Sequence, residues 1–281
     1  MTTICGLTAA QVASAFLVAP SAMSQRLLRA KRKLAGSGIL FEIPDARFWA
    51  ERLDAVLSTI EIAFARGHAD ASGRSVDATF AAQTLELMDL LSEMLAGNSE
   101  VHALAANLYF SQARRPARVN AQGQMVPLSL QDPAQWDPAA LERARQHFAL
   151  IDSAARSGSR AIQAELQSLW CSRESLRDPA PWVAVLASYD RLLAVEDTPF
   201  IRLNRAVAVC EVHGAQAALA AVIEVDAKSM RNHPVYHAVR AGLLARSGTT
   251  GEAKAEYDLA IAAQDNPVER DWLRARRGEL R

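Results

Sequence analysis

Apolar residues recur at helical spacing along most of this chain, and runs in which apolar and polar residues alternate are few. Beyond residue 44 the sequence is rich in alanine, leucine, glutamate and arginine, which favour helices, and prolines and glycines separate the periodic segments. The pattern therefore predicts an all-α protein. The helices expected beyond residue 44 cover 46–66, 77–96, 99–112, 138–157, 159–172, 179–195, 198–213, 215–226, 234–247, 250–265 and 267–280.

The beginning of the chain predicts two helices joined by a tight turn. A short helix over residues 9–16 follows Thr8, a candidate N-cap, and its apolar face consists of Val12, Ala13 and Phe16. A longer second helix has Pro20 in its first turn, and its apolar stripe consists of Met23, Leu27, Leu28 and Leu34. This spacing is that of a helix-turn-helix.

The second of these helices is strongly basic, which points to contact with DNA. Cationic side chains can reach phosphates along a groove, and the residues at the start of such a helix lie where base edges are read. The candidate DNA-binding residues are Ser21, Ser24, Gln25, Arg26, Arg29, Lys31, Arg32 and Lys33. The alternative is an ordinary amphipathic helix with a solvated basic face, and the capped helix and short turn that precede it favour DNA.

Several segments here resemble the fourth conserved region of extracytoplasmic-function (ECF) sigma factors. They are GLT at 6–8, VA at 12–13, FL at 16–17, MSQRL at 23–27 and RAKRKL at 29–34. In that family the helix-turn-helix reads the −35 element of the promoter. The resemblance thus implies a transcription initiation factor whose partners are promoter DNA and the RNA polymerase core.

The rest of the chain resembles the subgroup of these sigma factors that carries a long, tetratricopeptide-like helical extension. The matching segments are RLDAVLSTIEIAF at 52–64, ARRPAR at 113–118, LNRAVAVCEVHG at 203–214 and NPVERDWLRAR at 266–276. Family members also have a promoter-opening domain and two further helices before the helix-turn-helix. The chain is therefore expected to be the C-terminal part of such a protein, unable to initiate transcription by itself. Smaller departures are ARGH at 65–68, where the family tends toward NEGY, and QDP at 131–133, where it tends toward QDR.

A weak 34-residue period predicts helical hairpins toward the C-terminus. Gly214 and Gly248 lie 34 residues apart, and the same interval separates Tyr189, Ile223 and Tyr257. In the last unit, Ala253, Tyr257 and Ala260 recur as small, large and small residues where two helices would pack closely. The expected organisation is a partial helix-turn-helix over 1–43, a helical domain over 44–178 and tetratricopeptide-like repeats over 179–281, whose concave surface would bind a protein partner.

Composition changes this picture in one respect. The net charge is zero, but residues 1–44 hold five cations and one acid, a net of +4, so the other 237 residues carry −4. A basic N-terminal segment on a mildly acidic body suits a DNA-facing unit. Neither a transmembrane run nor a signal peptide is indicated, so a cytoplasmic location is expected. Three widely spaced cysteines favour reduced, buried thiols over disulfides.

Other candidate chemistry is weaker. Arg114, Arg115 and Arg118 could cap a helix, pair with acids or contact an anionic ligand or partner. His233 and His237 have i, i+4 spacing, but Pro234 lies between them and a third metal ligand is not indicated. Three acids, Glu51, Asp54 and Glu61, are expected to be solvated or paired with Arg47 and Arg52. We therefore expect neither an enzyme nor a cofactor or metal site, and the five tryptophans should anchor helices to one another.

Two hypotheses remain, and the oligomeric state stays open. In the first, the protein is an ECF sigma factor or its C-terminal part, with a regulatory helical extension. In the second, it is a helical-repeat adaptor for protein interactions, without sigma activity of its own.

The segment 116–137, the longest irregular stretch, is expected to form a small hairpin or an ordered loop.

Overall fold

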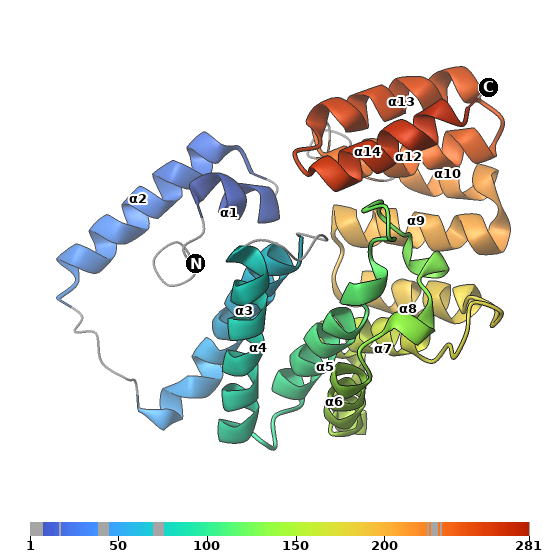
Figure 1. The fold of residues 1–281 in the computed structure, drawn as a ribbon. Helices are drawn as coiled ribbons and strands as arrows, with labels where there is room; N and C mark the ends of the chain where they lie inside the picture. The colour runs from blue at the N-terminus through green and yellow to red at the C-terminus, as the bar shows by residue number, and fades with distance from the viewer. Residues whose placement is uncertain are drawn as a thin grey trace.

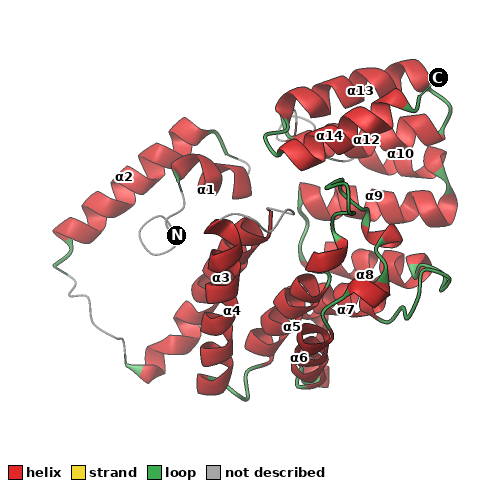
Figure 2. Cartoon of the chain, viewed as in Figure 1, coloured by secondary structure: helices red, strands yellow, loops and turns green. Residues whose placement is uncertain are grey.

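The computed structural model of the protein describes residues 8–16, 18–38, 45–69, 76–223, 225, 230 and 232–280. This part of the chain is all-helical (Figures 1 and 2), as the sequence predicts, and its only β-type pairing is an isolated bridge between Val119 and Met125. None of its helices is long and apolar enough to cross a membrane.

The helices follow one another as packed antiparallel neighbours. A pair at the N-terminus, α1 (Ala9–Ala15) and α2 (Pro20–Gly36), is followed by the α3–α4 hairpin, and α5 then packs against both α6 and α7. Hairpins of α8 with α9, α9 with α10, and α12 with α13 continue toward the C-terminus, where α14 covers α13. The bounds are α3 (Trp49–Ala69), α4 (Val76–Met94), α5 (Ser99–Ala113), α6 (Pro138–Ala149), α7 (Ser159–Cys171), α8 (Trp182–Val195), α9 (Pro199–His213), α10 (Ala215–Ile223), α12 (Pro234–Arg246), α13 (Thr250–Ala263) and α14 (Pro267–Gly278).

Local chemistry sets most of these boundaries. Four helices begin at a side chain that accepts hydrogen bonds from backbone N–H groups of the first turn. These N-caps are Asn98 of α5, Asp137 of α6, Thr198 of α9 and Asn266 of α14. Gly214 and Gly248 follow α9 and α12 with φ angles of +87° and +85°, a conformation that a side chain would strain. The 34-residue spacing of these glycines therefore marks two equivalent helix ends.

One predicted helix is interrupted. The segment 138–157 was expected to be a single helix, but α6 ends at Ala149 and a short 3-10 helix covers Ser153–Ser157. The interruption depends on tertiary contact, because the backbone N–H of Asp152 donates to the Ser99 hydroxyl at 3.0 Å. The Asp152 carboxylate then caps the new turn by accepting from the N–H of Ala154.

The core consists of consecutive apolar clusters along the array. One cluster is centred on α5, most of whose residues are buried, and a second joins α7 to α12. In the second, the Trp170 and Trp182 rings meet edge to face with centroids 4.9 Å apart, as expected for anchoring tryptophans. The described cysteines, Cys171 and Cys210, are free thiols buried in these clusters; Cys5 lies outside the described residues.

The C-terminal cluster confirms the close packing that was predicted around Tyr257. Ala253, Tyr257 and Ala260 are all buried, and Tyr257 packs beside Leu273 of α14. Ile223 does not fit the pattern, since 84% of it is exposed. The equivalence of Tyr189, Ile223 and Tyr257 was therefore wrong, because Ile223, at the end of α10, is not packed between helices as Tyr257 is.

The segment 116–137 forms an ordered loop, in which the Val119–Met125 bridge closes a turn and short 3-10 helices cover Leu128–Leu130 and Pro133–Gln135. The Asn120 side chain accepts from the backbone N–H groups of Gln122 and Gln124, and Gly123 takes a φ of +75°. Arg173, whose side chain is buried, donates to the carbonyl oxygen of Ser129 at 2.9 Å and so ties this segment to the end of α7.

The acids on α3 have a different partner from the expected one. Asp54 and Glu61 lie beside Arg160 of α7, at 2.9 and 3.9 Å. The expected pairing with Arg47 or Arg52 was wrong for these two acids, whereas the alternative of a solvated acid holds for Asp54, whose side chain is 82% exposed. Arg160 also contacts the Glu100 carboxylate of α5 at 3.0 Å and the hydroxyl of Ser58. A single guanidinium therefore joins α3, α5 and α7. Helical spacing could not indicate these contacts, because Arg160 lies about one hundred positions from the acids of α3.

Two imidazoles, the buried His102 and the half-buried His147, join α5 to α6. Nε2 of His102 lies 2.7 Å from the carbonyl oxygen of Ala96 and must donate to it, so Nδ1 of a neutral His102 accepts. The His147 Nδ1–H is then the donor across the 3.1 Å between the two Nδ1 atoms. Tyr109 stacks on His147 and donates to Asp89, which also pairs with Arg143, so the cluster is polar on one side.

This pair predicts a loss of stability in mild acid. Burial, followed by the neighbouring His102 imidazole, lowers the pKa of His147 below the ordinary 6.5. As the pH falls below about 6.5, His147 therefore binds a proton more readily in the unfolded chain than in the folded chain. The contribution of His147 to the free energy of unfolding is complete above about pH 6.5 and declines as the pH falls. Asparagine can keep a donor near the Nδ1 position without titrating. We expect His147→Asn to lose less unfolding free energy than the wild type between about pH 7.5 and pH 5.5, measured by urea denaturation. Equal losses would contradict this assignment.

Candidate nucleic-acid interface

The N-terminal helices α1 and α2 are joined by a turn of the length that the sequence predicts. The backbone N–H of Val18 bonds to the carbonyl oxygen of Ala13, and that of Met23 bonds to Ala19, so the chain leaves one helix and enters the next within four residues. Pro20 occupies the first turn of α2, where its missing N–H costs nothing. The Ser37 N–H and hydroxyl both bond to the Leu34 carbonyl oxygen at the far end.

A small apolar cluster holds the two helices together and seats them on α3. Val12, Ala13 and Met23 are buried in it, and Ile62 of α3 packs against them. Ile62 therefore links the α1–α2 pair to the rest of the described structure, which lies beyond α3 in Figure 1. The position of α3 thus influences the direction in which α2 points.

All eight candidate DNA-binding residues are exposed on α2. Their side-chain hydrogen bonds stay within the helix: the Ser24 hydroxyl donates to the Pro20 carbonyl oxygen, and Nε of Arg29 lies 3.4 Å from the carbonyl oxygen of Gln25. Within the described parts of the chain, no carboxylate forms an ion pair with the five cations, which are Arg26, Arg29, Lys31, Arg32 and Lys33. Their charges are therefore available to an external anion.

The cations do not share one face equally. With about 100° of rotation per residue, four of them fall within an arc of about 120°, which also contains Gln25. Lys31 lies outside this arc, about 40° from the half-buried Leu27. The basic arc is here defined as Arg26, Arg29, Arg32 and Lys33.

The predicted apolar stripe of α2 is covered only at its beginning. Met23 is buried and Leu27 is partly buried, whereas 49% of Leu28 and 65% of Leu34 are exposed. Phe16, expected on the inner face of the first helix, is 49% exposed as well. The prediction was wrong for these three residues. Leu28 and Leu34 lie beyond the cluster that Ile62 of α3 covers, and Phe16 follows the end of α1 at Ala15.

The three arginines of the ARRPAR segment do not converge. Arg114 is buried and donates to the Gln167 side chain at 2.5 Å and to the Cys171 sulfur at 3.3 Å, so it stabilises the α5–α7 contact. Arg115 is half-buried. Arg118 lies near Glu269 of α14, where its charge partly opposes the effect of burial, which raises the pKa of that carboxyl.

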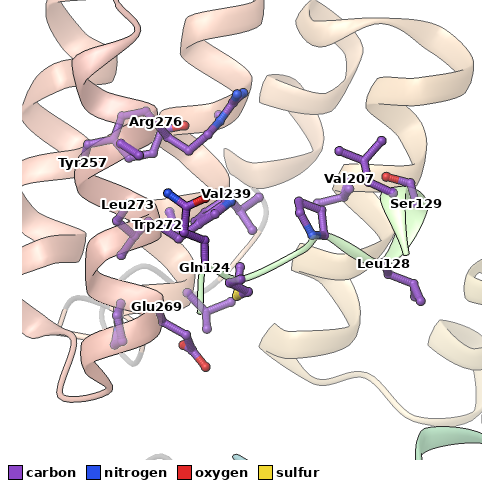
Figure 3. A pocket seen from close by; sticks show the side chains of 18 of the residues that line it. Gln124, Leu128, Ser129, Val207, Val239, Tyr257, Glu269, Trp272, Leu273 and Arg276 are labelled. Carbon is purple, nitrogen blue, oxygen red and sulfur yellow. The ribbon is translucent and has the colours of Figure 1, made fainter. Parts of the chain in front are cut away.

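The helical extension has a large groove, of about 1090 Å³, shown in Figure 3. Helices α8, α9, α12 and α14 form its walls, and the ordered turn around Gln124 and Leu128 forms another side. Its surface is mainly apolar and aromatic, with Tyr189, Val239 and Trp272 among the lining residues. The repeat pattern of the sequence predicted a concave surface here but gave no sign that the distant turn borders it.

Four charged groups that line this groove form two ion pairs. Arg246 contacts Glu211 at 2.5 Å, and Arg276 contacts Glu279 at 2.6 Å.

The two histidines considered as metal ligands have separate partners. His233 accepts from the Val235 N–H at the start of α12, while His237 lies 2.7 Å from the Glu256 carboxylate. The two imidazoles therefore serve different helix contacts.

Comparison with known proteins gives two matches. Residues 52–151 match a family described as "Family of unknown function (DUF6596)". An uncharacterized protein of Rhizobium meliloti (strain 1021) is 35% identical over 275 residues, which cover 96% of this chain and 64% of that protein. The chain therefore spans slightly less than two thirds of the length of this relative. No solved structure matches significantly.

Proposed function

We propose that the protein is a DNA-binding transcription factor of the ECF sigma type, or the C-terminal part of one, and that α2 contacts promoter DNA. The observation that supports this proposal best is the basic arc, in which four exposed cations share one side of the second helix of a helix-turn-helix. Guanidinium and ammonium groups arranged in this way bind phosphates along a groove, while Gln25 and Ser21 lie near the helix start, where base edges are read. Recognition of a −35 element and binding of RNA polymerase follow from the sequence resemblance.

In this proposal the helical extension is regulatory. Its groove is large, is lined by aromatic and apolar side chains, and lies on elements separate from α2. Surfaces of this kind in stacked helical hairpins bind peptides or proteins. The groove also favours the alternative function, in which the chain is an adaptor for protein interactions and the α1–α2 pair only packs against the helical extension.

Salt-dependent binding to duplex DNA distinguishes the two functions. We expect the chain to bind a fluorescently labelled duplex at low salt, and the logarithm of its affinity to fall with the logarithm of salt concentration by about 0.9 for each phosphate contacted. A duplex that carries a −35-like sequence should then compete better than a scrambled duplex. A folded chain that binds neither duplex at low salt would support the adaptor.

A further inference from the structure

The α3–α4 hairpin has an exposed apolar face that no described helix covers. Within the described structure, α4 packs mainly against α3 and α5. Four large apolar side chains of the hairpin are left between 44% and 54% exposed: Val56 of α3, and Leu87, Leu90 and Met94 of α4. We call these four residues the α3–α4 face.

A shallow groove runs between the two helices along this face. Its volume is about 250 Å³, and all of its lining side chains except Arg52 are apolar. Trp49, Leu53 and Val56 follow one another at i, i+4 and i+7 along α3, and Leu91, Met94 and Leu95 line the side of α4. Ridges of an opposing helix fit grooves of this kind.

The charged residues beside the face have opposite signs on the two helices. Arg52 is exposed at the α3 side, whereas Glu86 and Glu93 are exposed on α4, on the side of its apolar stripe away from α3. A twofold axis parallel to the helices would place α3 of one copy opposite α4 of the other. Arg52 lies at the level of Leu91 and Met94 in the groove, so it would meet Glu93 of the second copy.

The area is sufficient for such a contact. The two helices have 21 and 19 residues, which makes them about 30 Å long, and two adjacent helices are about 20 Å wide in total. One copy would therefore contribute roughly 600 Å², and two copies would bury roughly 1,200 Å², which reaches the lower end of specific interfaces. We propose that the α3–α4 face binds a second copy of this chain, forming a symmetric dimer in which Arg52 pairs with Glu93 across the interface.

The first test is the molecular mass of the full chain, measured by sedimentation over a range of concentrations. We expect twice the mass of one chain at high concentration and expect Leu90→Glu to shift the protein to monomer. Leu150→Glu is the matched control, because Leu150 is similarly exposed, at 58%, but lies at the end of α6. A wild-type chain that remains monomeric throughout, or a dimer that Leu90→Glu leaves intact, would overturn the proposal and leave the face to another partner.

Charge reversal tests the symmetric arrangement. Arg52→Glu and Glu93→Arg should each raise the dimer dissociation constant about tenfold, since each places like charges opposite one another. The double variant should restore the constant to within about threefold of the wild-type value. If the double variant is no better than either single variant, Arg52 does not meet Glu93 and the proposed pairing is wrong. Circular dichroism of each variant would exclude loss of fold as the cause.

Discussion

Replacing Arg26, Arg29 and Lys33 together by alanine is expected to weaken duplex DNA binding by more than about tenfold at moderate salt. All three side chains are exposed and lie within the basic arc of α2. Each phosphate contact that is lost should also reduce the slope of log affinity against log salt by about 0.9, which gives about 2.7 for three contacts. Fluorescence anisotropy with a labelled duplex at several salt concentrations measures both quantities.

Lys31→Ala provides the matched control for this experiment. It removes a neighbouring positive charge from the same helix but lies outside the basic arc, so affinity should fall less than about threefold. Alanine favours helix, and none of these residues is in the core, so both variants should retain the wild-type helical signal. Equal effects per charge would instead indicate a diffuse electrostatic attraction without a preferred face, and an unchanged affinity in the triple variant would reject α2 as the DNA contact.

Arg160→Met is expected to cause the largest loss of folding stability, about 2–3 kcal/mol in urea denaturation. Only 13% of the Arg160 side chain is exposed, and its removal leaves three carboxylates without their shared cation: Asp54, Glu61 and Glu100. The expected loss is smaller than the roughly 3–5 kcal/mol typical of a fully buried pair, because 82% of the Asp54 side chain is exposed and remains solvated.

The stability defect of Arg160→Met should depend on pH. Burial raises the pKa of Glu61 above its ordinary value of 4.5, and the nearby Arg160 opposes this effect, so the variant should have a still higher pKa at Glu61. A carboxyl with a raised folded pKa favours the folded state below its unfolded pKa, and this contribution is lost as the pH rises through the folded value. The difference in unfolding free energy between variant and wild type should therefore be smaller near about pH 5 than near pH 8.

Arg274→Met is the control for the loss of an ion pair. Arg274 contacts Asp271 at 2.9 Å, but both side chains are more than half exposed, so the expected cost is below about 1 kcal/mol. Comparable losses in the two variants would show that Arg160 does not act as a junction between helices. Arg160 fixes α3 to α5 and α7, and Ile62 of α3 contacts the α1–α2 pair. Arg160→Met therefore weakens the attachment of the helix against which α1 and α2 pack.

The sequence by itself determined the elements whose signals are local. Capping side chains, prolines in first turns and helical spacing located α1, α2 and most later helices to within a few residues, because these features act within one or two turns. The exposure of the basic residues on α2 was equally predictable, since isolated cations at the surface need no distant partner.

Only the tertiary structure decided which faces were covered and which charged groups were paired. The end of α6 at Ala149 depends on Ser99, and the role of Arg114 depends on Gln167 and Cys171, all distant in sequence. The sharing of Arg160 among three helices, the exposure of Leu34 and the groove beside Leu128 likewise depend on how helices far apart in the chain pack. Helical periodicity specifies an apolar or charged side, but the element that meets that side is selected by packing of the whole chain.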